Sequence, residues 1–114
     1  MVVRMSAGEF QIVYSTVPDR LCGQVIADTL VSKKLAACVN LIPGIESTYF
    51  WEGSLQHDQG CLLMIKTQTA DYMAVEAAIR ELHPDELPEI IAVPLSSGSP
   101  DYLHWITRSL DKTP

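Results

Sequence analysis

The chain has 114 residues, a formal net charge of −6, 47% hydrophobic residues and 19% charged residues. This length is enough for one folded domain with a single core and too short for two. The negative charge argues against the basic surface that nucleic-acid binding requires, and no apolar run approaches the roughly 20 residues of a membrane span.

The first nine residues lack the apolar centre of a secretory signal, so we expect residues 1–9 to be a flexible lead-in to one domain over 10–114. Cys22, Cys38 and Cys61 are odd in number and form no CxxC pair. Reduced thiols and a cytoplasmic location are therefore expected.

The first elements predicted after this lead-in are a strand and a helix. Residues 10–16 are rich in β-forming residues. Pro18 and Asp19 then provide the residues that open a helix, and apolar side chains recur at helical spacing over 20–34. This spacing predicts a helix that packs on one side only.

Two short strands are expected next, over 36–42 and 45–52, because Pro43-Gly44 interrupts the first and Gly53 ends the second. We expect them to pair as an antiparallel ribbon, followed by a polar connection over 54–60. The continuous apolar run 61–65 predicts a strand that is buried on both faces.

A second helix is predicted from a cap at Thr69 to Leu82, followed by a strand over 90–95. Ser99-Pro100-Asp101 then has the cap, proline and acid that start a third helix. The order strand, helix, three strands, helix, strand, helix predicts an α+β ferredoxin-like sandwich with an extra C-terminal helix.

In such a sandwich both main helices cover the same face of the sheet. Strand alternation places apolar side chains on the other face as well. With Tyr49, Phe50 and Trp51 added, the uncovered surface would exceed the few hundred Å² that monomers usually expose. The sequence therefore predicts an oligomer.

Five sequence blocks, in this order, resemble the CutA divalent-cation-tolerance family over about residues 11–110. They are the blocks 36–44 (AACVNLIPG), 47–53 (STYFWEG), 65–67 (IKT), 83–89 (HPDELPE) and 101–105 (DYLHW). The resemblance implies a homotrimer related in form to PII-type signalling proteins and a role in tolerance of copper and other divalent cations.

The resemblance also suggests metal ligands. Cys38 matches the family cysteine of the second strand and His83 the histidine before proline, while Asp85 adds a carboxylate. Imidazole and carboxylate suit Cu(II) or Zn(II). The alternative interpretation is that His83 ends a helix and that the carboxylates of 85–89 face water.

A cleft between subunits is the second site hypothesis, with a small anionic metabolite as its ligand. Its residues would be Trp51, Glu52, Lys66, Glu89, Tyr102 and Trp105. A third hypothesis is an assembly platform without a ligand. No nucleophile motif or phosphate-binding glycine loop is present, so we do not expect an enzyme.

Overall fold

The computed structural model describes residues 9–113, so all but Glu9 of the predicted lead-in 1–9 lies outside the described residues. The elements are β1 (Phe10–Val17), α1 (Arg20–Ser32), β2 (Cys38–Trp51), β3 (Ser54–Gln68), the 3-10 turn η1 (Thr69–Asp71), α2 (Tyr72–Leu82), β4 (Ile91–Pro94) and α3 (Pro100–Leu110).

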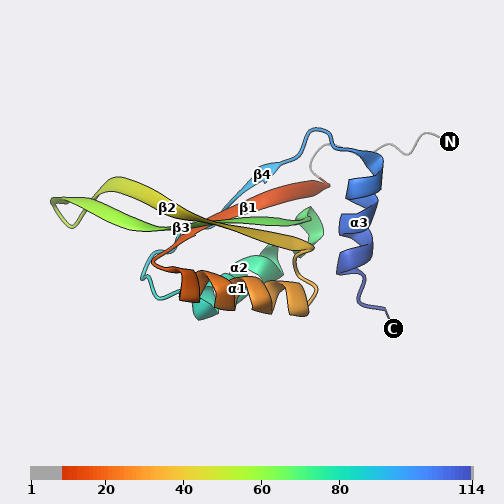
Figure 1. Cartoon of the computed structure of the whole chain (residues 1–114), viewed down its shortest axis with the longest axis horizontal. Coiled ribbons are helices and arrows are strands. Elements are labelled where there is room, and N and C mark those ends of the chain that lie inside the picture. Colours follow the sequence, from red (N-terminus) through yellow and green to blue (C-terminus); the bar gives the residue numbers. More distant parts are fainter. Residues whose placement is uncertain (1–8, 114) are drawn as a thin grey trace.

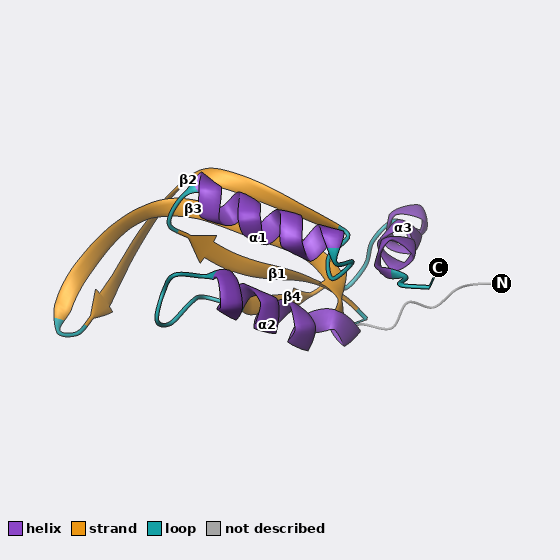
Figure 2. Cartoon of the chain, turned by 90° about the horizontal axis from the view of Figure 1, so that it is seen from below, coloured by secondary structure: helices purple, strands orange, loops and turns teal. Residues whose placement is uncertain are grey.

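The four strands form one sheet in the order β2-β3-β1-β4, and each neighbouring pair is antiparallel. Helices α1 and α2 lie on the same side of this sheet, and α3 lies at one end of it (Figures 1 and 2). The predicted α+β ferredoxin-like sandwich, with its long ribbon and extra C-terminal helix, is confirmed.

The ribbon differs from the prediction. Residues 38–51 are one continuous strand, and the segment 54–60, expected to be a connection, is the first half of β3 and pairs with it. Pro43 is tolerated because β2 is an edge strand, and Gly44, with φ of 81°, forms a bulge that lets pairing resume at Ile45. The proline and glycine therefore bend the strand without ending it.

Glu52 and Gly53 make the turn between β2 and β3, both with positive φ, at 48° and 81°. Two such residues in a row are the signature of a two-residue hairpin whose twist matches that of the flanking strands. Because β2 and β3 have 14 and 15 residues against 8 in β1, the ribbon that this turn closes extends well beyond the rest of the sheet, as Figure 1 shows.

Helix α1 starts where Asp19 accepts a hydrogen bond from the backbone N–H of Cys22 at 2.8 Å. Gly23 faces the sheet, and a Cβ there would lie 2.8 Å from a methyl group of Leu41. Because no side chain intervenes at this position, the helix can lie close to the strands.

The main core lies between the two helices and the sheet. Alternate residues of β1 and β3 are buried on this face, and α1 and α2 close it from the other side. Its buried apolar members are Val13, Val17, Ile26, Leu30, Ala36, Cys61, Leu63, Ile65, Val75 and Ile79.

Ser15 lies in this core, fully buried, and among the described residues its hydroxyl has no hydrogen-bond partner. We predict that Ser15→Ala raises the free energy of unfolding by about 1 kcal/mol, because it removes an unsatisfied buried polar group. Chemical denaturation at a fixed protein concentration measures this change. A loss of stability would mean that the hydroxyl has a partner, such as an ordered water.

A second, smaller core holds α3 against the end of the sheet. Ser99 caps the helix by accepting from the N–H of Tyr102 at 3.2 Å, and Pro100 follows at the first helical position, as predicted. The buried members are Phe10, Ala37, Leu103, Ile106 and Leu110.

The sheet face opposite α1 and α2, called the open face below, remains apolar. Cross-strand pairing places Ile12 beside Val93, Tyr14 beside Ile91 and Ile42 beside Leu62 on it. Ile91 and Val93 are 55% and 47% exposed.

No helix within residues 9–113 is long and apolar enough to cross a membrane.

Candidate functional site

A groove of about 960 Å³ lies between the far half of the ribbon and the loop 83–90 that joins α2 to β4. Figure 2 shows this loop extending from the end of α2 beneath the curved ribbon. The ribbon supplies Tyr49, Trp51 and Asp58 to the groove, and the loop supplies Asp85, Glu86 and Glu89.

His83 fixes the start of this loop. Its side chain is fully buried, Nε2 lies 2.7 Å from the carbonyl oxygen of Thr16, and Nδ1 accepts a hydrogen bond from the backbone N–H of Asp85 at 3.1 Å. Since Nδ1 accepts, Nε2 carries the proton and donates to Thr16. Both ring nitrogens are therefore engaged within the chain.

Helix α2 ends at this histidine, which has an extended backbone with φ of −79° and ψ of 133°. Pro84 imposes this conformation on the residue before it, so the chain must leave the helix here. The proline thus turns the imidazole toward the end of β1. This position agrees with the alternative interpretation, in which His83 ends a helix.

Cys38 lies elsewhere. It is the first residue of β2, directly opposite Lys66 of β3, which pairs in turn with Ile12 of β1. Thr16, the partner of His83, is four residues further along β1, about 13 Å away along the strand. Cys38 and His83 therefore lie apart within one chain, and a metal ion shared by the two across subunits stays a prediction.

Asp85, the third predicted ligand, has an exposed carboxylate 4.0 Å from Nδ1 of His83. Over residues 9–113, no three side chains of His, Cys, Asp or Glu come together in an arrangement that could hold a metal ion.

The six residues predicted for the cleft separate into two groups and a turn residue. The Nζ of Lys66 lies 5.7 Å from the ring centre of Tyr102, and the Tyr102 and Trp105 rings are 5.4 Å apart, so these three form a cluster beside α3. Trp51 and Glu89 line the groove instead, and Glu52 occupies the hairpin turn.

Tyr49 and Asp58 also line the groove, and neither was predicted as a site residue. The Tyr49 hydroxyl donates a short hydrogen bond to the Asp58 carboxylate. This bond, with smaller effects of desolvation and of the charges of Asp58 and Asp85, raises the pKa of Tyr49. Residues 54–60 were expected to be a connection and not a strand. Had they been recognised as a strand, the alternation of Ser47, Tyr49 and Trp51 would have placed Tyr49 and Asp58 on the same face of the ribbon.

Cys22, in the first turn of α1, is affected by the charge of the same loop. Burial, then the charges of Asp19 and Asp85, raises the pKa of its thiol. Because the pKa in the folded state exceeds that in the unfolded state, the stabilisation by this group is complete below the unfolded pKa and is lost as the pH rises through the folded pKa.

We predict slow alkylation of Cys22 by iodoacetamide at pH 8, with a rate that continues to rise at pH values where an ordinary thiol has reached its plateau, because only the thiolate reacts. Asp85→Asn should speed the reaction, since it removes a negative charge. Mass spectrometry of tryptic peptides over a pH series measures both rates. A rate equal to that of a free cysteine peptide would contradict the prediction.

The chain matches the family described as CutA1 divalent ion tolerance protein over residues 11–109. The divalent-cation tolerance protein CutA of Thermus thermophilus is 41% identical over 99 residues, which are 87% of this chain and 96% of that protein. The chloroplastic protein CutA of Arabidopsis thaliana is 45% identical over 98 residues, 86% of this chain.

The chain spans about half the length of the Arabidopsis, rice and mouse relatives, with 54%, 55% and 56% of each covered. Among solved structures, CutA from Xylella fastidiosa aligns with a TM-score of 0.88 at 41% identity, covering 90% of this chain and 99% of that one. Together with the ferredoxin-like fold, these matches show that the chain belongs to the CutA1 divalent ion tolerance protein family.

Proposed function

We propose that this CutA-type divalent-cation tolerance protein acts as a homotrimer that binds a divalent cation, with copper or zinc as its ions. The observation that carries the proposal is the open face, where large apolar side chains remain exposed on a chain of this family. Identical copies that cover one another's open faces would remove this surface from water.

The ribbon supports assembly as well. Its last turn carries exposed apolar residues: Tyr49 at 42%, Phe50 at 71%, Trp51 at 38% and Leu55 at 57%. Figure 1 shows that the ribbon projects beyond the helices, and this projection supports the proposal that its end contacts a second copy. A projecting apolar hairpin is unfavourable in an isolated chain and favourable when a partner covers it.

The proposed metal ligands are Cys38 of one chain and Asp85 of a neighbouring chain, because the two residues lie apart within a single chain. Cys38 begins β2 near the open face that assembly would bury, and Asp85 is exposed on the loop. A thiolate with oxygen or nitrogen donors suits Cu(II) and Zn(II). His83 serves in this proposal to position the loop, because both of its ring nitrogens are engaged.

Calorimetric titration of tag-free protein with Cu(II) and with Zn(II) tests the metal proposal. We expect saturable binding that is lost in Cys38→Ala and weakened in Asp85→Asn. Glu81→Gln, which changes an exposed carboxylate on α2, is the matched control and should bind as the unchanged protein does. Undiminished binding by Cys38→Ala would reject this ligand set.

A PII-like sensor of a small anion is the second candidate, and Lys66 favours it. Among the described residues this ammonium has no carboxylate partner and lies over the Tyr102 ring. A thermal-shift screen with nucleotides and small organic acids tests it, because a ligand that binds only the folded state raises the melting temperature. No shift at millimolar ligand would leave metal binding or a ligand-free assembly platform.

We also propose a cytoplasmic location and a binding role rather than an enzymatic one. The three thiols remain unpaired, as is usual in a reducing compartment. The raised pKa of Cys22 disfavours the reactive thiolate. Relatives are named chloroplastic in Arabidopsis and periplasmic in Archaeoglobus fulgidus, so fractionation of cells that express the full-length protein is the direct test.

A further inference from the structure

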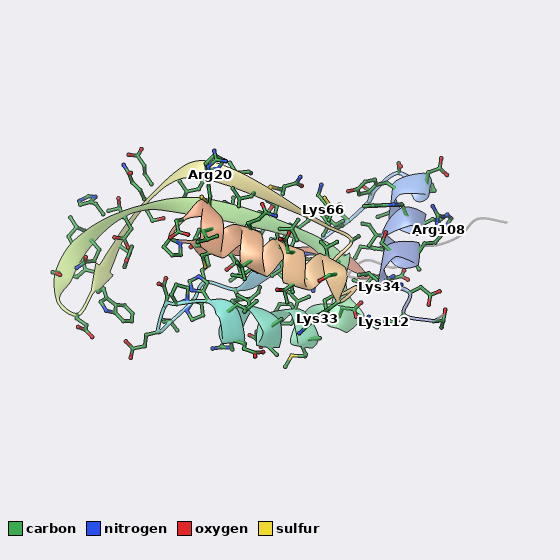
Figure 3. All side chains as sticks on the ribbon, turned by 60° about the horizontal axis from the view of Figure 1, so that its bottom comes forward. Arg20, Lys33, Lys34, Lys66, Arg108 and Lys112 are labelled. Atoms are coloured by element: carbon green, nitrogen blue, oxygen red, sulfur yellow. The ribbon has the colours of Figure 1, made fainter. Side chains whose placement is uncertain are left out.

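Lys66 carries a positive charge that no carboxylate within residues 9–113 neutralises. It pairs with Ile12 of β1 and with Cys38 of β2, so its side chain lies on the open face. Figure 3 shows it on the body of the sheet, toward α3 and away from the hairpin turn. An ammonium group that is covered without a counter-charge destabilises the covered state. Assembly over the open face therefore favours an arrangement in which the covering chain places an anionic group next to Lys66.

The surroundings of Lys66 are aromatic. Its Nζ lies 5.7 Å from the ring centre of Tyr102, and the rings of Tyr102 and Trp105 are 5.4 Å apart. The two rings are 42% and 39% exposed, and through Lys66 they adjoin the open face. We call these three residues the Lys66 cluster. A complementary partner has aromatic side chains to pack on the rings and a carboxylate to pair with the ammonium group.

The hairpin turn at the end of the ribbon has this composition. Phe50 and Trp51 are 71% and 38% exposed, and Glu52 follows them in the turn itself, with φ of 48°. Within residues 9–113 the Glu52 carboxylate makes no ion pair. Several other carboxylates already accept side-chain hydrogen bonds within the chain: Asp28, Asp58, Asp71 and Glu76. The turn therefore offers two aromatic rings and an unpaired carboxylate at the tip of the projecting ribbon.

One chain cannot bring its own turn to its own Lys66. Lys66 pairs with Cys38 at the start of β2, whereas the turn follows Trp51 at the end of the same strand. The strand has 14 residues. At about 3.3 Å per residue, its two ends lie roughly 40 Å apart. A contact between the turn and the Lys66 cluster thus requires two chains.

We propose that the hairpin turn of one copy docks on the Lys66 cluster of the next, with Glu52 paired to Lys66 and with the aromatic residues of the two sides in contact. This inference rests on the proposed homotrimer. Each chain has one turn and one cluster, so each copy gives its turn to one neighbour and receives a turn from the other, and three copies close a ring. The contact brings Glu52 to Lys66 and Tyr102, which the sequence analysis assigned to one cleft between subunits.

Carbodiimide cross-linking of the unchanged protein tests the contact, because this reagent joins only carboxylates and amines that touch. We expect an amide between Glu52 and Lys66, found by mass spectrometry of peptides from covalent dimers and trimers of the chain. Glu81, an exposed carboxylate on α2, is the control and should form no link to Lys66. A particle of trimer mass that lacks the link between Glu52 and Lys66 would overturn the proposed contact and leave the homotrimer standing.

Charge reversal tests the ion pair itself. Glu52→Lys and Lys66→Glu should each speed the exchange of subunits between isotope-labelled and unlabelled trimers on the order of tenfold. The double variant Glu52→Lys/Lys66→Glu should restore the original rate, because the pair forms again with its charges exchanged. Native mass spectrometry measures this exchange, and Glu81→Lys should exchange as the unchanged protein does.

Two results of the exchange experiment would overturn the proposal. A double variant that exchanges as fast as the single variants would mean that the two charges do not meet. Unchanged exchange in Glu52→Lys would mean that Lys66 takes a small anion instead of the turn. A particle of 12.6 kDa would reject the homotrimer and this contact together, so the measured mass tells which of the two inferences has failed.

Discussion

Gly60→Ala is expected to lower the free energy of unfolding by about 3 kcal/mol. A Cβ at this position would lie well inside van der Waals contact of the Val17 carbonyl oxygen and 3.3 Å from its carbonyl carbon. Both are backbone atoms at the end of β1, so relief requires that a strand of the sheet moves. Denaturant unfolding at one fixed protein concentration measures the change.

Gly44→Ala is the matched control in the same ribbon. No atom of residues 9–113 lies within 4 Å of a Cβ built there, so within this part of the chain only its φ of 81° opposes alanine, at a cost of about 1 kcal/mol. If the two variants lost equal stability, the close approach of Gly60 to Val17 would not be the cause.

His83→Ala is expected to cost a similar amount, about 3 kcal/mol. It leaves a cavity at a fully buried side chain and takes the hydrogen-bond donor from the carbonyl of Thr16. It also removes the acceptor of the Asp85 N–H, so hydrogen exchange at that amide should become fast. Exchange rates from NMR and a denaturation curve test the two effects on the same sample.

His104→Ala provides the comparison, since that imidazole is exposed on α3 and its loss should change stability by less than about 0.5 kcal/mol. If His83→Ala were as stable as this control, the two hydrogen bonds would not hold the loop, and His83 would return as a free metal ligand. If stability fell while exchange at Asp85 stayed slow, the loop would have another attachment.

The sequence predicts the helices better than the ribbon. Capping residues and apolar spacing identified α1 and α3 because helix signals lie within a few neighbouring residues. Thr69 was expected to cap the second helix, yet it begins the turn η1 and the helix starts at Tyr72. Pro43 and Gly44 were predicted to end a strand. In the structure they form a bulge within β2, which is possible because β2 is an edge strand.

The candidate site was less predictable because it depends on contacts between distant segments. Asp85 and Glu89 were singled out by their proline-rich context, but only the folded ribbon brings Trp51 and Asp58 to the facing wall. Cys38 and His83 were paired by the family resemblance and by their ligand chemistry. Strand register, which the sequence does not state, places them at different ends of the sheet.

The mass of the protein in dilute solution tests the central claim most directly. If copies of this chain cover one another's open faces as a trimer, sedimentation or light scattering should report one species of about 38 kDa, three times the 12.6 kDa chain. A single 12.6 kDa species would contradict the account, because Ile91 and Val93 would then remain exposed to solvent in a stable monomer.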